Sequence, residues 1–535
     1  MPAAPPADPL SPSIPRSPLL ARSICENTIR INNLRVGVEG LSAEGLGVDL
    51  GEGGPRPTSP PSPLASLRLA ASSLMAGLWL LLAASPSLAE PPAPAKPTDA
   101  IQRWVHPTGA TVILIERHDF PYATFDVTLR TGALWDPAGK AGLANFTAEL
   151  MARGAGARDR AAIDSAFDRL GADLEIVAGQ TGLSLEGDAL ARTLNDVVEI
   201  LGDVVQRPTF EPGEFDKLKR EIESDILRIR DNDQTLNRRF FKRYLYGAHP
   251  YGRPADGTVA GTRAITLDDV RAFYKAHFVA RNVIVALSGD VTRAQAEAIV
   301  DRRVGALPRD QEAPGVTLPG LPTPTGRQVL LVDKPDRTQN QILLGHLSPD
   351  ATSPDHYALE VANTIFGGTF TARLNHQVRD VRGLSYGAYS TLSSDLYAGS
   401  FSMWTFPSSQ DGLKTVELLI ELFEGLLAAP LTDEEVAFAR EYRAGAFAFD
   451  IDTPAKLATE AVRAELEGRP ADYLSTYVAR INAVTTAQVN KAVQAHLDPR
   501  NFLLVMLCTA AGFEGAMKAL PGVTTVKVVP YDQDF

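Results

Sequence analysis

Apolar and polar positions alternate in two different ways along residues 97–535, and this pattern predicts paired strands followed by helices. Phe125, Val127 and Leu129 alternate with polar residues, which is typical of a strand that is buried on one face. Longer segments repeat apolar residues with helical spacing. The predicted strands are Thr111–Ile115, Phe125–Leu129, Val283–Leu287, Gln328–Val332, Gln341–Gly345 and Phe502–Leu507. The predicted helices are Leu190–Val205, Phe215–Arg230, Val416–Leu427 and Glu434–Tyr442.

This arrangement occurs twice along the chain. Thr266, Val270, His277, Arg281 and Asn282 recur at a constant offset of 219 residues. The matching residues are Thr485, Val489, His496, Arg500 and Asn501. A helix, a proline and a second helix precede each of the two stretches. The repetition predicts two homologous domains, and the shared positions of His277 and His496 favour structural roles for these histidines.

Each domain has strands first, then helices, then a further strand, which predicts an α+β fold with an antiparallel-dominated sheet packed against helices. We place the N-terminal domain at residues 97–311 and the C-terminal domain at residues 327–535. Residues 312–326 lie between them and contain four prolines, which favour an extended, semi-rigid linker.

The first 89 residues differ from the rest of the chain. Residues 1–66 are rich in Pro, Ser, Gly and Ala without a sustained apolar period, so we predict an unstructured extension or a mis-assigned start. Residues 67–89 contain Arg68, an apolar run from Leu74 to Ala84, and small residues at Ser87 and Ala89. This order is typical of a secretory signal peptide, although a buried helix is an alternative. It predicts export across the inner membrane to the periplasm, with no stable membrane span after cleavage.

Composition narrows the possible functions. The formal net charge of −12 argues against a nucleic-acid partner, which would require a basic face. This negative net charge favours basic or unfolded peptides over acidic peptides as substrates. Cys25 and Cys508 are the only cysteines, which excludes a disulfide scaffold and a cysteine-based zinc cluster.

Several motifs resemble those of the pitrilysin/insulinase-type zinc peptidases, and most closely the branch of the mitochondrial processing peptidases and their two-subunit bacterial relatives. The resemblance covers residues 97–535. The motifs that carry it are Gly142-Leu-Ala-Asn145, His249-Pro-Tyr-Gly-Arg-Pro254 with Gly257-Thr258, Phe273-Tyr274, Asn282, Gly289-Asp290 and Arg382-Gly-Leu-Ser-Tyr386.

In that family a helix carries H-x-x-E-H, in which two histidines bind zinc and the glutamate acts as general base. The matching positions here hold Asn145, Ala148 and Glu149, and the position of the third family ligand, a glutamate, falls on Asp225. One amide and two carboxylates without imidazole are a poor set of zinc ligands, and no base remains. No two of the eight histidines lie within five residues of each other, so no helical histidine pair exists elsewhere. We therefore predict a degenerate metal site and no cofactor in this chain.

The C-terminal domain keeps a different part of the family's machinery. Arg379 is followed seven residues later by Tyr386, and the resemblance implies that this pair contacts the substrate and stabilises the oxyanion. The family match further assigns substrate binding to Gly367, Gly368, Thr369, Phe370 and Arg382. We interpret the glycine pair as opening a helix through Leu374 to Arg379, with positive φ and close approach by another chain. Alternatively, Arg379 is a last-turn cation that favours the helix dipole and Tyr386 is an ordinary sheet aromatic.

Two functional hypotheses follow, together with a less favoured third. The first is a non-catalytic, substrate-binding subunit of a heterodimeric secreted zinc metallopeptidase, whose homologous partner supplies H-x-x-E-H and the zinc and which acts on extended peptides. The second is a peptide-binding or scaffold protein of the same fold without peptidase activity. The third is a peptidase with unusual ligands, for which metal analysis of the pure protein is the test.

The signal-peptide hypothesis predicts a mature chain that begins at Glu90. N-terminal sequencing of the secreted protein measures this directly. A mature protein that retains residues 1–60 would contradict the hypothesis.

Overall fold

The structure is a computed structural model that describes residues 96–533. The predicted extension at residues 1–66 and the predicted signal peptide at residues 67–89 lie outside the described residues. The described residues form one compact unit.

The first half contains a six-stranded mixed sheet. Its strand order is β1-β2-β8-β3-β7-β6, and all neighbouring strands are antiparallel except β2 and β8. The strands are β1 (Ile101–Val105), β2 (Thr111–Glu116), β3 (Tyr122–Leu129), β6 (Glu175–Ala178), β7 (Leu183–Leu190) and β8 (Val283–Gly289), with a separate short pair β4 (Gly154–Ala155) and β5 (Arg158–Asp159). The helices are α2 (Leu143–Met151), α3 (Arg160–Leu170), α4 (Leu194–Gln206), α5 (Pro212–Arg228), α6 (Asp233–Tyr246), α7 (Val259–Ala264), α8 (Leu267–His277) and α9 (Arg293–Arg303).

The second half repeats this architecture. Its sheet has the order β11-β12-β10-β13-β9-β14, and β9 is parallel to both of its neighbours. The strands are β9 (Arg327–Asp333), β10 (Gln341–Ser348), β11 (Ala388–Ser394), β12 (Gly399–Thr405), β13 (Phe502–Cys508) and β14 (Val523–Pro530). The helices are α10 (His356–Phe366), α11 (Arg373–Asn375), a π-helix (His376–Val381), α12 (Gly412–Ala428), α13 (Asp433–Asp450), α14 (Pro454–Leu466), α15 (Tyr473–Ala483), α16 (Thr486–His496) and α17 (Glu514–Ala519).

The common strand order confirms the predicted α+β fold with two homologous halves. In each half the last of the predicted strands lies between the first two predicted strands, as β2-β8-β3 and as β9-β13-β10, and in the second half a further strand, β14, pairs with the outer side of β9. The repeated sequence stretches also form equivalent helices. Thr266 caps the start of α8, and Thr485 caps the start of α16. In each case the threonine side chain accepts a hydrogen bond from the backbone N–H of the third helical residue, and the side chain of that residue accepts one from the threonine backbone N–H.

The repeated histidines both make structural contacts. His277 is buried, its Nδ1 lies 3.2 Å from Thr131 Oγ1, and burial lowers its pKa to about 4. His496 Nε2 lies 2.7 Å from an Asp355 carboxylate oxygen. These contacts agree with the structural roles that the duplication suggested.

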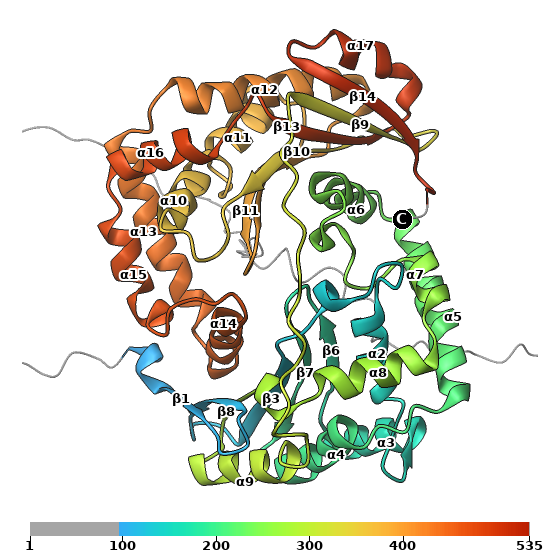
Figure 1. Cartoon of the computed structure of the whole chain (residues 1–535). Helices are drawn as coiled ribbons and strands as arrows, with labels where there is room; N and C mark the ends of the chain where they lie inside the picture. The colour runs from blue at the N-terminus through green and yellow to red at the C-terminus, as the bar shows by residue number, and fades with distance from the viewer. Residues whose placement is uncertain (1–95, 534–535) are drawn as a thin grey trace, which may run out of the picture. The chain divides into compact units, whose positions relative to one another are not determined.

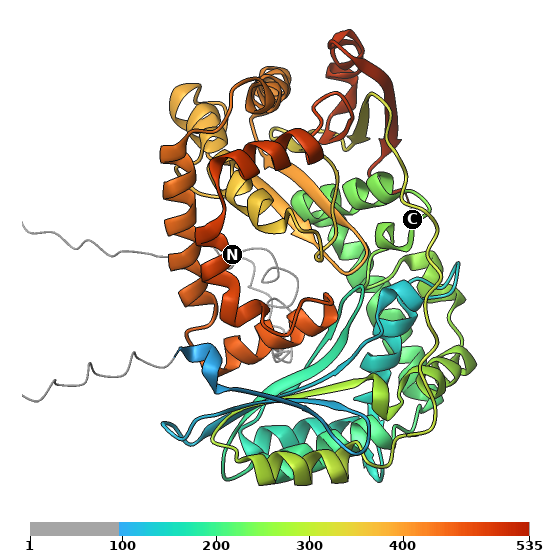
Figure 2. The same ribbon diagram turned by 60° about the vertical axis from the view of Figure 1, so that its left-hand side comes forward.

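Each half contributes one helix to the sheet of the other half. α6 packs on β10 and β13, and α14 packs on β2 and β8. Figure 1 shows α6 against the sheet of the second half and α14 beside the sheet of the first half, and Figure 2 shows the same exchange from another side. The buried side chains that α6 provides are Leu236, Phe240, Phe241 and Leu245, and those of α14 are Leu457, Ala458, Ala461 and Val462.

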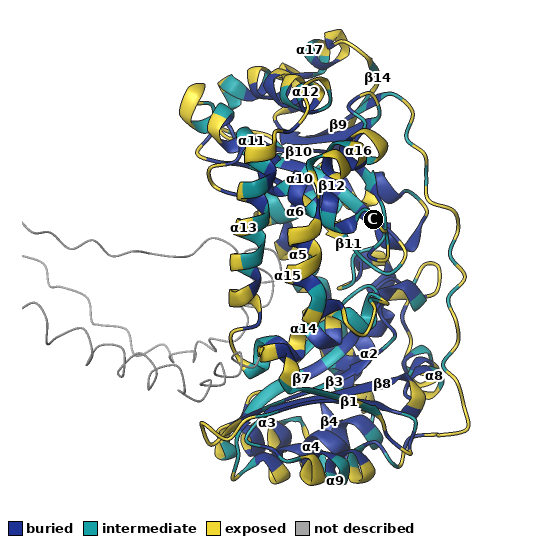
Figure 3. Ribbon diagram, turned by 90° about the vertical axis from the view of Figure 1, so that its left-hand side faces the viewer, coloured by how far each residue is buried: buried dark blue, intermediate teal, exposed yellow. Residues whose placement is uncertain are grey.

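This exchange explains why the central strands β8 and β13 are apolar at successive positions. In β13, Leu503, Val505 and Leu507 face α6, whereas the alternate residues Phe502 and Leu504 face the helices of their own half. Both faces of the central strands are therefore buried, as the dark blue strands in Figure 3 show. A strand that is covered on both faces has a continuous apolar run instead of an alternating one.

Polar contacts reinforce the exchange at both helices. Glu465 in α14 accepts hydrogen bonds from Arg103 Nη2 at 3.2 Å and Arg130 Nη2 at 2.8 Å, both from the first half. Asn237 in α6 is fully buried and donates to the backbone oxygen of Gln341 at 3.2 Å.

None of the helices within residues 96–533 is both long and apolar enough to cross a bilayer.

Replacing Glu465 by Gln should lower the free energy of unfolding by about 2 kcal/mol, because two arginines lose their charged acceptor. Burial opposes the ionisation of Glu465, but Arg103 and Arg130 outweigh this effect and its pKa lies below the ordinary value. The stabilisation is therefore present above the unfolded pKa, near 4.3, and is lost as the pH falls through the folded pKa. Urea unfolding at pH 7 and pH 3.5 measures the difference.

The matched control is Glu417→Gln, which changes an exposed glutamate of α12. This variant should unfold like the wild type at both pH values. Equal stability of the Glu465 and Glu417 variants at pH 7 would show that the two arginines do not depend on Glu465.

Candidate functional site

The helix that should carry the metal ligands begins at a buried carboxylate. Gly142, the residue before α2, has a positive φ of 97°. Asp136 accepts hydrogen bonds from the backbone N–H groups of Gly142 at 2.6 Å and Ala144 at 2.9 Å. Burial raises the pKa of Asp136 to about 7, although these two donors favour its ionised form. Asp136 therefore fixes the start and direction of α2.

Two sequence motifs meet at this point. A Cβ on Gly142 would lie 2.7 Å from the Cα of Gly257, so neither position leaves room for a side chain. Arg253 Nη1 donates to the backbone oxygen of Asp136 at 2.7 Å. The motif that contains His249 and Gly257 thus supports α2 by close backbone packing. Asp136 was missed as a positioning residue because it belongs to no recognisable spacing pattern, and Arg253 was recognised only as part of the motif His249–Pro254, without a role.

The degenerate metal-binding positions share one helix. Asn145 and Glu149 are half-buried one turn apart on α2, and Ala148 is fully buried. Asp225 lies on α5, which packs along α2. Burial raises the pKa of Glu149, and the carboxylates of Glu221 and Asp225 raise it further. The structure therefore brings Asp225 close enough to Glu149 for their charges to interact.

An arginine balances this acidic cluster. Arg153 is 8% exposed, and its Nη2 donates to Glu221 Oε2 at 2.6 Å. The charges of Arg153 and Arg160 also oppose the rise in the pKa of Glu149. Within residues 96–533, no group of three or more His, Cys, Asp or Glu side chains is arranged to hold a metal ion. The residues present do not fit zinc, because imidazole is absent and guanidinium groups pair with the carboxylates.

The glycine pair of the second half has a different role from the predicted one. Gly367 and Gly368 end α10 instead of opening a helix, and the next helix begins at Arg373. Gly367 has φ −158°, so a positive φ is not needed there. A Cβ on Gly367 would lie 2.5 Å from Ser390 Oγ of β11. A strand of the same chain therefore approaches Gly367 closely, and approach by another chain stays a prediction.

Arg379 and Phe370 come together at the surface. Phe370 is 49% exposed, and the Arg379 guanidinium carbon lies 4.5 Å from the centre of its ring. Thr369, beside Phe370, is buried, and its hydroxyl has no hydrogen-bond partner in the described part of the chain. Arg379 lies on the π-helix His376–Val381, a rare geometry that is frequent at functional sites.

Tyr386 and Arg382 lie on the exposed turn between the π-helix and β11. Tyr386 is 86% exposed, and β11 begins only at Ala388. The alternative that Tyr386 is an ordinary sheet aromatic is therefore wrong. A phenol with no hydrogen-bond partner among residues 96–533 is available to donate to a bound molecule.

Asn375 holds these pieces together and was not found from the sequence. It is fully buried, and its Nδ2 donates to the backbone oxygen of Phe370 at 2.6 Å. Its Oδ1 accepts from the backbone N–H of Ala388 at 3.0 Å. One side chain thus links the loop that carries Phe370 to the strand that follows Tyr386. A lone asparagine in a helical segment provides no sequence signal for this role.

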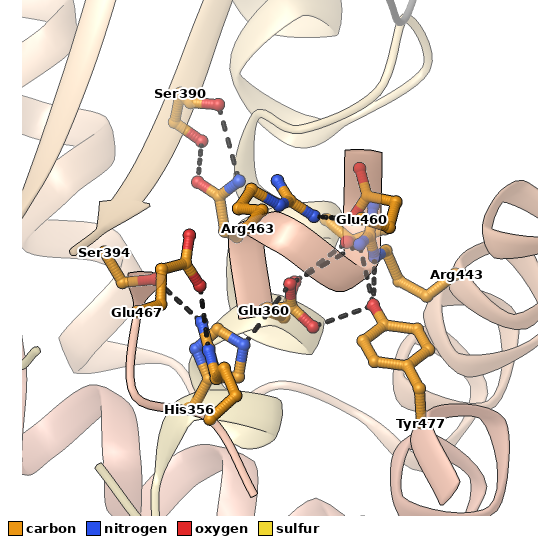
Figure 4. A network of polar contacts seen from close by, with 12 residues as sticks. His356, Glu360, Ser390, Ser394, Arg443, Glu460, Arg463, Glu467 and Tyr477 are labelled. Atoms are coloured by element: carbon orange, nitrogen blue, oxygen red, sulfur yellow. Dashed lines mark hydrogen bonds and ion pairs between the residues drawn. The ribbon is translucent and has the colours of Figure 1, made fainter. Parts of the chain in front are cut away.

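The equivalent helix pair of the second half also contains ion pairs. α10 packs on α13, as α2 packs on α5. Tyr477 donates to Glu360 at 2.8 Å and accepts from Arg443 Nη2 at 2.7 Å, and His356 lies beside them (Figure 4). Burial lowers the pKa of His356 to about 4. This cluster is a network of paired charges that joins α10, α13 and α15.

Comparison with known proteins identifies the family. Residues 111–259 match the family described as insulinase (peptidase family M16), and residues 264–442 match the family described as the peptidase M16 inactive domain. Together these matches span more than half of the chain. The chain belongs to the insulinase-type, M16 peptidase family.

Curated relatives cover much of the chain at low identity. An uncharacterized zinc protease of Mycobacterium leprae is 25% identical over 403 residues, which is 74% of this chain and 89% of the relative. The uncharacterized zinc protease YmxG of Bacillus subtilis is 21% identical, over 73% of this chain and 94% of the relative. Human cytochrome b-c1 complex subunit 1 is 26% identical over 47% of this chain and 52% of its own length.

Solved structures show the same fold. The peptidase M16 inactive domain from Pseudomonas fluorescens has a TM-score of 0.70 and 25% identity, over 80% of this chain and 99% of that chain. The periplasmic protease PqqL from Escherichia coli has a TM-score of 0.66 and 14% identity, over 79% of this chain and 49% of that chain. These similarities support the predicted family and fold.

The purified chain should hold less than a tenth of an equivalent of zinc after dialysis, because its site lacks imidazole ligands. The triple variant Asn145→His, Glu149→His, Asp225→Glu should bind about one zinc, because three ligands are then restored on α2 and α5. Metal analysis after equilibrium dialysis measures both. The matched control replaces Asn145 and Glu149 by Ala and Asp225 by Glu, and should remain metal-free.

Stoichiometric zinc in the wild-type protein that disappears in the alanine control would contradict the assignment of a degenerate site. Circular dichroism of each variant shows whether α2 and α5 remain folded.

Proposed function

We propose that this chain is the non-catalytic, substrate-binding subunit of a heterodimeric, secreted zinc metallopeptidase. The observation that carries the proposal is the contrast between the two halves. In the first half, arginine–carboxylate pairs take the place of metal ligands around Glu149. In the second half, the Tyr386 phenol is 86% exposed, and Arg379 is stacked on Phe370 nearby in the sequence.

In this proposal a homologous partner with H-x-x-E-H supplies the zinc and the general base. The H-x-x-E-H motif of the partner would hold the zinc, which would supply Lewis-acid polarisation and an activated water there. Tyr386 of this chain donates a hydrogen bond to the oxygen on which negative charge develops, and Arg379 holds a neighbouring substrate carbonyl. Both side chains are donors, so they stabilise an oxyanion without a proton transfer of their own.

The exposed sheet edges support an extended peptide as substrate. β6 and β11 end their respective sheets, and each pairs with one neighbour only. An edge strand offers backbone donors and acceptors to an added strand with little dependence on sequence. Asn375 joins β11 to the loop of Phe370. A peptide bound at the edge of β11 therefore lies near the segment that carries Arg379 and Tyr386.

Export follows from the predicted signal peptide at residues 67–89. We propose a periplasmic location, in line with the name of the PqqL relative, which is described as a periplasmic protease. The partial similarity to a cytochrome b-c1 complex subunit favours, as a second candidate, a scaffold protein of the same fold without peptidase activity.

Co-purification from the native host separates these two candidates. The peptidase proposal requires a homologous companion chain with H-x-x-E-H, and peptide cleavage by the complex that a chelator abolishes. A complex with other proteins and no chelator-sensitive cleavage would favour the scaffold.

In the purified complex, Tyr386→Phe should lower kcat about 100-fold and leave KM within about twofold, because the phenol acts mainly on the transition state. The matched control is Tyr397→Phe, which removes the hydroxyl of another exposed tyrosine and should leave turnover unchanged. Steady-state kinetics on a fluorogenic peptide measure both values. Unchanged turnover in Tyr386→Phe would remove Tyr386 from the mechanism.

A further inference from the structure

α6 carries a concentration of positive charge that contrasts with the acidic chain. Four of its 14 residues are basic, namely Arg238, Arg239, Lys242 and Arg243, whereas the whole chain has a formal net charge of −12. The only acidic residue of α6, Asp233, is paired with Lys334 at 2.6 Å and with Arg337 at 3.3 Å. The buried face of α6 lies on the second sheet, so its basic side chains lie along the border of the contact.

Aromatic side chains lie beside this basic helix, on the same sheet. Trp404 of β12 and Tyr389 of β11 are cross-strand partners whose rings stack at 6.2 Å between centres. The ring of Phe406 lies 4.8 Å from Trp404. The Arg238 guanidinium carbon lies 5.7 Å from the centre of the Trp404 ring. All three aromatic residues are half-buried, so part of each ring faces solvent.

Lys242 is the reachable cation of this region. It is exposed, and it has no hydrogen-bond or ion-pair partner within residues 96–533. Desolvation by the surrounding protein lowers the pKa of Lys242, and the positive charge of Arg238 lowers it further. The carboxylates of Asp395 and Asp256 act in the opposite direction and raise it. These two acidic neighbours are already engaged. Asp256 pairs with Arg239, and Asp395 accepts from the Leu396 backbone at 2.7 Å and from Thr181 at 3.1 Å.

We propose that the surface formed by Arg238, Lys242, Tyr389, Trp404 and Phe406, called the α6–β12 surface, binds a polypeptide segment that contains carboxylate and aromatic side chains. The cationic groups attract the carboxylates, and the flat faces of Trp404 and Tyr389 stack with aromatic rings. The inference deepens the proposed function, on which it rests for the substrate being a peptide. Tyr389 follows the candidate oxyanion donor Tyr386 by three residues, so one extended chain can reach both.

This inference reverses the preference that the net charge suggested. Charges on an exposed surface are screened over about 8 Å at physiological salt, so a bound segment responds to the side chains next to it and little to the distant acidic surface. The local arrangement of charge therefore decides the substrate class.

Peptide binding to the isolated full-length chain tests the inference. The probes are two fluorescein-labelled 12-residue peptides that differ only in charge, one alternating Glu with Tyr and the other alternating Lys with Tyr. Fluorescence anisotropy should show at least tenfold tighter binding of the Glu peptide, and its affinity should fall as salt increases. Equal affinity, or tighter binding of the Lys peptide, would overturn the proposal.

Variants locate the binding. Lys242→Glu should weaken binding of the Glu peptide at least tenfold. The matched control Lys491→Glu makes the same charge change at an exposed lysine of α16 and should leave the affinity within twofold. Equal losses in both variants would show a nonspecific effect of net charge and overturn the assignment.

Tryptophan fluorescence provides a second, local measurement. An unlabelled Glu peptide should change the intrinsic fluorescence of the wild-type chain, and Trp404→Phe should remove that change while Trp135→Phe keeps it. A change that persists in Trp404→Phe would place binding elsewhere. Binding by the isolated chain can succeed even if no catalytic companion is found, so failure of the proposed function remains distinguishable.

Discussion

The reciprocal exchange of α6 and α14 is the interaction on which the rest of the structure depends. Each helix leaves its own half and covers the open face of the other sheet. Neither sheet could bury both faces of its central strands without this exchange, because the helices of its own half cover one face only. Since buried apolar area is the dominant favourable term in folding, the two halves stabilise each other. Burial of apolar side chains does not by itself fix the orientation of α14. The hydrogen bonds of Glu465 with Arg103 and Arg130 fix that orientation.

The two candidate sites both depend on contacts to the backbone around them. The scaffold around α2 is intact, since Asp136, Gly142, Arg253 and Gly257 still fix the helix by backbone contacts. The positions that match the family's histidines hold Asn145 and Glu149, and the nearby Glu221 of α5 pairs with Arg153 and Arg160. In the second half, Asn375 performs a comparable structural task for the loop and strand around Arg379 and Tyr386.

The charged side chains of the chain differ in whether they are paired. Both helix pairs, α2 with α5 and α10 with α13, contain arginines matched with glutamates, so their charges are largely satisfied within the pair. On α6, by contrast, Lys242 is exposed one turn from Arg238 and has no ion-pair partner among residues 96–533. Paired charges contribute mainly to the structure, whereas an unpaired and reachable charge can attract a ligand. The net charge of the chain does not distinguish these two situations.

The amino-acid sequence by itself determined the duplication, the α+β class, the family, and the absence of histidines at Asn145 and Glu149 and of the glutamate base at Ala148. These features depend on local periodicity and on residue identity at fixed spacing, which are readable along the chain. It also predicted the strands Val283–Leu287 and Phe502–Leu507 as apolar runs. Only the tertiary structure decided that α6 and α14 cover the opposite sheets, that Gly367 packs against Ser390, and that Asn375 joins Phe370 to Ala388. These contacts join residues that are distant in sequence or that lie in irregular segments, and no period or spacing encodes which surfaces meet when two halves pack together.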